Sequence, residues 1–199
     1  HITVKPYETK ISNLEKTNLD LISEDLIYSN SGESVIIKKD ISKGIVLRGY
    51  SGADFSRLEI INNKNFFGDK RDFKHNSISI SKELSFNLDI KIGDSITVMS
   101  SAGLETIIGS LPKQKTFIVS SLFESGLADF DNNIAFVNLK TLEEFFNLKP
   151  EDRILEIYLK NPQNIESQKN IVQKIFPNDF VFSWADMNRS LFSALKVER

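Results

Sequence analysis

Residues 154–182, with the sequence ILEIYLKNPQNIESQKNIVQKIFPNDFVF, decide the fold class of this 199-residue chain. Apolar and polar residues alternate over residues 154–159, which is typical of a strand. Asn161 and Pro162 then mark the start of a helix, because asparagine caps helices well and proline fits the first helical position. Apolar residues recur at helical spacing until the next proline, and residues 180–182 predict a returning strand. The stretch therefore predicts a β-α-β unit.

Such a unit has a right-handed crossover and needs a neighbouring strand, which the first part of the chain can supply. Residues 2–4 alternate like a strand, and residues 44–51 form another. Two further strands are expected over residues 19–28 and 34–38, joined by a polar turn over residues 29–32 that contains a glycine. Together with the β-α-β unit, these strands predict an α+β fold.

The middle of the chain has weaker signals. Residues 54–76 are polar and are expected to be mostly loop. The run SKELSFNLDIKIGDSITV, residues 81–98, predicts a short helix capped by its first serine and a Gly-Asp turn that leads into a strand. Residues 100–115 are expected to form a loop or a long hairpin. Two strands follow, and Asn138 caps a further helix after the second of them.

The composition is that of a globular chain with one ordinary domain or two small lobes. Hydrophobic residues make up 40 % and charged residues 26 %, and 25 Lys and Arg against 27 Asp and Glu leave a net charge of -2. This balance argues against a nucleic-acid partner, because such domains need a basic excess to meet the phosphates. The chain has no cysteine, which excludes disulfides, thiolate nucleophiles and cysteine-based metal sites.

The residues form no recognisable catalytic or cofactor motif. Besides His1 the chain has one histidine, His75, too few for a zinc site without cysteine. Neither a G-x-S-x-G elbow nor a phosphate-binding G-x-x-x-x-G-K-[ST] loop is present. Asp129 and Asp131 begin like a calcium loop, but its glycine and final glutamate are missing, so both are expected to be turn residues. The sequence predicts no enzyme, no metal and no cofactor; a secreted hydrolase or ligand-binding domain stays open as an alternative.

Residues 102–111 connect two predicted strands and carry four aliphatic residues among glycines. Exposed aliphatic side chains in a cluster indicate a surface that binds a partner. Alternatively, the connection folds back and the four side chains join the core. The four residues are Leu104, Ile107, Ile108 and Leu111.

Five stretches follow one another in the order of a known set of motifs. They are GIVLRGYS, SKELSFNLDIKIGDSITV, SLPKQKTFIV, FESGLADFDNNIAFVNL and SWADMNRSLFSALKVER, and they lie between residues 44 and 199. In this order they resemble the MacB-like group of ABC-transporter permeases, and most of all the periplasmic domain of lipoprotein-releasing permeases of the LolC/LolE type. Asp89 stands where that group has the glycine of a Leu-Gly-Val motif.

The resemblance implies an α+β fold in two lobes. Residues 1–53 and 153–199 would form a porter lobe that contains the β-α-β unit and leads into a transmembrane helix. Residues 54–152 would form an inserted, β-rich sabre lobe. In this family one permease carries a hook that recruits a periplasmic lipoprotein chaperone, and the hook corresponds to residues 101–111. Ile107 and Ile108 occupy the place of a proline near its tip.

The resemblance also implies partners and a location. Gln114 and Lys115 match family positions that support a LolA-type chaperone beside the hook. A separate cytoplasmic ATPase subunit of the LolD type would drive a complex of this chain and a second permease subunit in the inner membrane. This domain would act in the periplasm and pass motion to the lipoprotein cargo. A MacB-like efflux permease with an adaptor protein is the alternative within the family.

Both ends of the sequence are expected to continue. The chain does not open with methionine, and Ser183 with Asp186 three residues later predicts a capped helix over residues 183–199 that no glycine, asparagine or proline ends. The sequence itself contains no apolar run of the roughly 20 residues that cross a bilayer.

Overall fold

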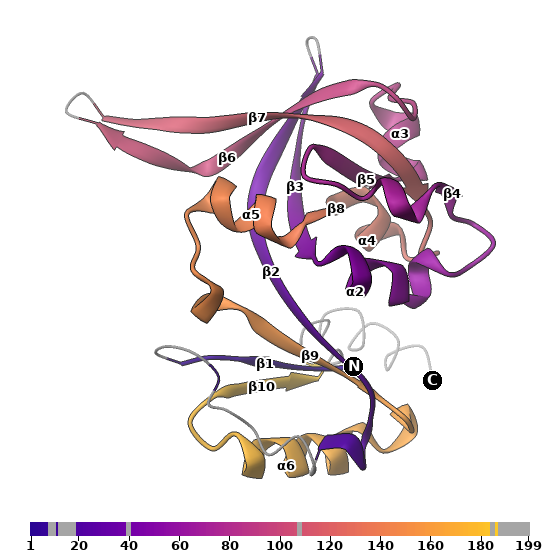
Figure 1. Ribbon diagram of the computed structural model, residues 1–199, viewed down its shortest axis with the longest axis vertical. Helices are drawn as coiled ribbons and strands as arrows, with labels where there is room; N and C mark the ends of the chain where they lie inside the picture. Colours follow the sequence, from indigo (N-terminus) through magenta and orange to yellow (C-terminus); the bar gives the residue numbers. More distant parts are fainter. Residues whose placement is uncertain (8–10, 12–18, 39–40, 107–108, 184–185, 187–199) are drawn as a thin grey trace, which may run out of the picture. The chain divides into compact units, whose positions relative to one another are not determined.

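The computed structural model describes residues 1–7, 11, 19–38, 41–106, 109–183 and 186 (Figure 1). Contacts between Cα atoms divide the chain into two compact units: unit 1 is His1–Tyr28 with Lys149–Arg199, and unit 2 is Ser29–Leu148. The chain passes from unit 1 to unit 2 after Tyr28, which is earlier than the predicted lobe boundary after residue 53. The reason is that β3 (Ile41–Tyr50) pairs on both sides with strand residues of unit 2.

Unit 1 contains the predicted β-α-β unit. β9 (Ile154–Leu159) leads through a 3-10 turn, η4 (Pro162–Asn164), to α6 (Ile165–Ile175) and then to β10 (Phe180–Ser183). β1 (Ile2–Lys5) lies between β9 and β10 and is antiparallel to both, so β9 and β10 run parallel. The expected neighbouring strand is therefore confirmed. The shared core includes Ile2, Val4, Leu155, Ile157, Val172, Phe176 and Val181.

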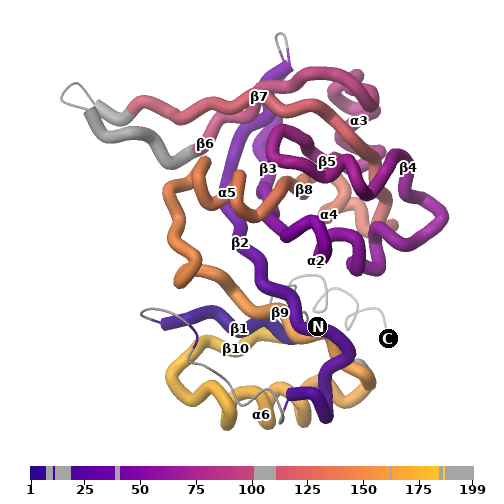
Figure 2. The backbone as a smooth tube through the Cα atoms, in the orientation of Figure 1, coloured from indigo at the N-terminus to yellow at the C-terminus, as the bar shows by residue number. Residues whose placement is uncertain are grey.

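Unit 2 is built on a closed ring of six strands. Besides β3 they are β2 (Ser23–Lys38), β5 (Ser77–Ser81), β6 (Ser95–Thr106), β7 (Gly109–Phe123) and β8 (Ile134–Asn138). β2 begins in unit 1, and its residues from Ser29 onward belong to unit 2. The pairing runs β2–β3–β8–β5–β7–β6 and returns to β2, parallel between β3 and β8 and between β5 and β7 (Figure 2). A sheet that closes in this way is a small barrel, whose interior receives alternate side chains of each strand. These include Ile36, Leu47, Ile80, Val98, Val119 and Val137.

Short elements surround the barrel and connect its strands. Two predicted caps are confirmed: the Leu84 N–H donates to Ser81 Oγ at 3.0 Å, and the Lys140 N–H donates to Asn138 Oδ1 at 3.1 Å. Residues 54–76, expected to be mostly loop, contain short elements: most of α2 (Gly52–Arg57), then η1 (Glu59–Ile61), β4 (Phe67–Gly68) and η2 (Lys70–Asp72). The helices elsewhere in unit 2 are α3 (Lys82–Asn87), α4 (Ala128–Asn133) and α5 (Leu139–Phe146). Unit 1 has its own short element, η3 (Pro150–Asp152).

The turn expected over residues 29–32 is wrong. β2 runs unbroken through these residues, and Gly32 pairs with Leu47 of β3. A Cβ at Gly32 would lie 2.5 Å from Cζ of Phe146, which is closer than carbon atoms pack. The glycine therefore makes room for an aromatic ring of α5 and does not turn the chain.

Candidate functional site

The predicted hook lies on a β-hairpin made by β6 and β7. The two strands pair from Ser95 opposite Ile118 to Thr106 opposite Gly109, with a register irregularity between Met99 and Gly103. Of the two forms expected for residues 100–115, the hairpin is therefore confirmed. The strands are longer than predicted, because cross-strand hydrogen bonds continue through residues that have no alternating pattern.

The base of the hairpin is anchored in the barrel. β6 pairs with β2 from Thr97 opposite Ile37 to Ser100 opposite Ser34. Beyond Ser100, the pairings of β6 among the described residues are with β7 alone. The hook residues thus extend from a base that is fixed on both sides by hydrogen-bonded strands.

The predicted site residues have different positions on this hairpin. Leu104 and Leu111 are direct partners across the two strands, and Leu111 is 56 % exposed. Ile107 and Ile108 lie outside the described residues. Gln114 is exposed and lies opposite Met99, with its Nε2 3.8 Å from the Met99 sulfur.

Lys115 has a different environment from its neighbour Gln114. Successive residues of a strand point to opposite faces, so one flat partner surface cannot meet both side chains from the same face. Lys115 lies opposite the core residue Val98, and its ammonium is 5.8 Å from the centre of the Phe117 ring. This geometry is suited to a cation–π contact, and it places the charge close to the barrel.

Two side-chain contacts of this region are not predicted from the sequence. Lys113 of β7 donates from Nζ to the carbonyl of Glu144 at 2.6 Å, near the end of α5, where helix carbonyls attract a cation. Asp94 accepts from Lys38 Nζ at 2.5 Å. That hydrogen bond and one from the Lys91 N–H lower the pKa of Asp94 below its ordinary value. A single sequence gives no signal for either contact, because each joins distant segments.

The Gly-Asp turn before β6 fixes the start of this strand. Gly93 has φ +93°, a conformation that side chains rarely adopt. Its N–H donates to the Val119 carbonyl at 2.8 Å, and the Val119 N–H donates to the Asp94 carbonyl at 2.9 Å. The motif therefore attaches the beginning of β6 to β7, and so sets the register at the base of the hairpin.

Asp131 stabilises the turn at Ser125 and Gly126, within the stretch FESGLADFDNNIAFVNL. Its carboxylate is buried and accepts from the Ser125 N–H at 3.0 Å, the Ser125 hydroxyl at 2.7 Å and the Gly126 N–H at 3.1 Å. Gly126 has φ +80°, so the turn requires a glycine at this place. The expectation that Asp129 and Asp131 are turn residues is wrong, because both lie on the short helix α4. The Asp131 carboxylate holds the turn that precedes this helix, and Asp129 is exposed.

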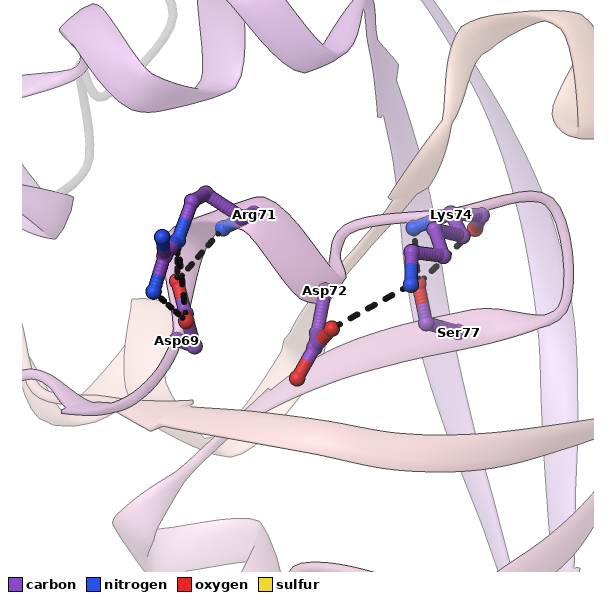
Figure 3. Close-up of polar contacts among 5 residues, drawn as sticks. All are labelled: Asp69, Arg71, Asp72, Lys74 and Ser77. Carbon is purple, nitrogen blue, oxygen red and sulfur yellow. Dashed lines mark hydrogen bonds and ion pairs between the residues drawn. The ribbon is translucent and has the colours of Figure 1, made fainter.

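Polar residues also gather between β4 and β5 (Figure 3). Arg71 clamps Asp69 with hydrogen bonds from Nε and an η-nitrogen, which lower the pKa of Asp69 from 3.8 to about 2. His75 is exposed, and its Nδ1 lies 2.7 Å from the Thr141 hydroxyl, which donates to the His75 carbonyl. These contacts bind segments of the fold to one another. Within the described part of the chain, no three His, Asp or Glu residues could hold a metal ion together.

Several curated proteins are similar to this chain, although no family model matches it. LolC of the lipoprotein-releasing system from Xylella fastidiosa (strain 9a5c) is 29 % identical over 126 residues, 62 % of this chain and 30 % of that protein. LolC from Neisseria meningitidis serogroup B is 24 % identical over 89 % of the chain and 42 % of the protein. LolC from Buchnera aphidicola of Acyrthosiphon pisum is 27 % identical over 96 % and 45 %. The chain thus spans less than half the length of these relatives.

Two solved structures share the fold. The extracellular domain of the ABC-type transporter YknZ from Gram-positive bacteria has a TM-score of 0.50 at 12 % identity, over 91 % of this chain and all of that one. The periplasmic region of MacB from Actinobacillus actinomycetemcomitans has a TM-score of 0.50 at 10 % identity, over 96 % and 91 %. The mixed α/β fold and the similarity to periplasmic domains of LolC-type and MacB-like permeases are confirmed.

Proposed function

We propose that this chain is the periplasmic domain of an inner-membrane ABC-transporter permease that releases lipoproteins. The observation that carries this proposal is its similarity to LolC proteins over nearly all of its length. The fold of two permease domains outside the membrane supports it. The similarity also supports a place in the periplasm at the inner membrane. In the described residues, no helix is long and apolar enough to cross a bilayer.

The geometry of unit 1 suits a domain inserted between two membrane helices. The chain enters the sheet at Ile2 and leaves it at Ser183, and these two residues are direct partners on neighbouring strands. Partners across an antiparallel pair lie about 4.5–5.5 Å apart. The axes of two packed helices lie about 8–10 Å apart. Two short connections are therefore sufficient to join Ile2 and Ser183 to two neighbouring membrane helices.

In this proposal the domain works mechanically and is not an enzyme. A LolD-type ATPase subunit in the cytoplasm supplies the energy, and a second permease subunit completes the complex. Unit 1 corresponds to the porter lobe and unit 2 to the sabre lobe. The domain passes the motion to the lipoprotein cargo and delivers the cargo to a LolA-type chaperone.

The hairpin is the proposed docking site of the chaperone. Leu104, Ile107, Ile108 and Leu111 supply the apolar contact, and Gln114 and Lys115 support it at the base of the hairpin, each from its own face of β7. Leu111 supports this role because more than half of its side chain is exposed. A few apolar anchors provide most of the binding energy of such a contact.

Binding of the purified chaperone to this chain tests the docking site. Leu111→Ser should weaken binding by about tenfold or more, as the loss of an interface anchor does. Ile118→Ser is the matched control, because Ile118 is 44 % exposed on the same strand but lies at the barrel. Melting temperatures should stay close to that of the wild type in both variants. Unchanged chaperone binding by Leu111→Ser combined with serine at positions 107 and 108 would exclude the hairpin as the docking site.

A MacB-like efflux permease is the second candidate, favoured by the shared fold with the MacB periplasmic region. Such a permease works with an adaptor protein in place of a chaperone. Binding of an adaptor protein, with no binding of the chaperone, would decide for this candidate.

A further inference from the structure

Three side chains of unit 1 connect the end of β10 to α6. They are Ser183, the last residue of β10, Asp186, three residues later, and Lys169 in the first half of α6. Ser183 is fully buried, and the side chains of Lys169 and Asp186 are 24 % and 16 % exposed. The three residues therefore meet largely out of solvent at the point where the chain leaves the sheet.

Ser183 and Asp186 form a reciprocal pair. The Asp186 N–H donates to Ser183 Oγ at 3.1 Å, and the Ser183 N–H donates to Asp186 Oδ2 at 2.8 Å. This is the arrangement of a capping box, which fixes the direction in which a helix starts from the preceding residue. The predicted cap is confirmed, although the rest of the helix expected over residues 183–199 lies outside the described residues.

Lys169 connects this box to another element. Its Nζ lies 2.6 Å from Asp186 Oδ2, the same oxygen that accepts from Ser183. The hydrogen bond from Lys169 has the largest effect on the pKa of Asp186. Together with the hydrogen bonds from Ser183, it holds this pKa far below its ordinary value. Partly buried ion pairs are screened less than exposed ones, so this contact persists in salt.

Ser183 and Lys169 both belong to packed elements of unit 1. Ser183 pairs with Ile2 in the three-stranded sheet, and α6 is seated in the core through Val172. A segment that is joined to a folded unit through its backbone alone can change direction, because each residue has two backbone dihedral angles that rotate easily. A second attachment through Lys169 removes that freedom.

We propose that Ser183, Asp186 and Lys169 form a joint that transmits motion between the sheet of unit 1 and the part of the chain that follows residue 186. With the joint closed, a movement of that segment turns the sheet and α6 together. This inference rests on the proposed function, because it takes the following segment to be the one that runs to the membrane. All three are positioning residues: they fix a direction and do not touch cargo.

The test uses the full-length permease in its complex with the ATPase subunit in proteoliposomes, with lipoprotein release to the purified chaperone and ATP hydrolysis measured together. Lys169→Met should lower the lipoprotein released per ATP by about tenfold, within the range of typical couplings between sites. ATP hydrolysis itself should persist. Lys169→Arg should retain release, because it keeps the charge. Lys74→Met is the matched control: it removes an exposed ion pair with Asp72 in unit 2 and should change neither rate.

Hydrogen exchange of the peptide that contains residues 183–186 provides a readout independent of transport. Lys169→Met should speed its exchange, and Lys74→Met should not. If Lys169→Met leaves the exchange of this peptide unchanged, the proposed joint is excluded. It is also excluded if the exchange becomes faster while the lipoprotein released per ATP stays the same. A wild-type complex that hydrolyses ATP but releases no lipoprotein would contradict the proposed function. The joint would then be judged by hydrogen exchange alone.

Discussion

Gly32→Ala tests the packing of a strand against a helix in unit 2. The new Cβ would lie 2.5 Å from Phe146 Cζ and 2.6 Å from each Cε atom. Carbon atoms pack at about 3.5–4.0 Å, so the ring would have to move by roughly 1 Å. Phe146 packs against the barrel core, and its ring centre lies 5.1 Å from that of Phe145 in an edge-on contact. These neighbours restrict the movement of the Phe146 ring.

The expected cost follows from two opposing effects. Overpacking of this kind costs about 1–3 kcal/mol. Replacing glycine gains about 0.4–1 kcal/mol through the unfolded chain. The difference is a loss of about 1–2 kcal/mol, which should lower the melting temperature of a chain of this size by about 3–6 °C.

Thermal and urea unfolding followed by circular dichroism measure this loss. Gly44→Ala is the control, because Gly44 also lies in a barrel strand but a Cβ there meets nothing within 4 Å. Gly44→Ala should therefore leave the stability equal or slightly higher. In a Phe146→Ala background the cost of Gly32→Ala should vanish. If Gly32→Ala is as stable as Gly44→Ala with Phe146 intact, the close approach of the two elements is refuted.

Two further substitutions test single features of unit 2. Asp89 has φ +47° at the end of α3, so Asp89→Gly should raise the free energy of unfolding by about 0.5–1 kcal/mol, measured by urea unfolding; an equal or lower value would contradict left-handed strain at this residue. Arg71→Ala should return the pKa of Asp69 from about 2 toward 3.8, as followed by carboxyl NMR titration. Because the pKa is lowered in the folded state, the stabilisation by this pair is complete above about pH 5 and is lost as the pH falls toward 2. A pKa of Asp69 that is the same with and without Arg71 would show that the clamp does not form.

The predicted helix caps and the β-α-β unit, which rest on local signals, are found in the structure, whereas the turn predicted over residues 29–32 is not. Ser81, Asn138 and Ser183 each cap through a hydrogen bond to a residue two or three positions later, so the sequence pattern contains both partners. The β-α-β unit is equally local, because alternation, a capped helix and a proline stop occur within one stretch. The hairpin over residues 100–115 is one of the two forms that the sequence predicted, but the opposite faces of Gln114 and Lys115 follow only from the strand register.

The helix caps, the β-α-β unit and the resemblance to a permease domain can be predicted from the amino-acid sequence, because each depends on a short run of residues. The closure of the strands of unit 2 into a barrel is seen only in the three-dimensional structure, since β2 and β6, like β3 and β8, pair across long stretches of chain. The role of Gly32 is likewise seen only there. A glycine signals a turn when only its neighbours are considered, whereas here Phe146 occupies the space that a side chain would need. Packing between distant segments overrode the local preference, because the free energy of a filled core exceeds that of a turn residue.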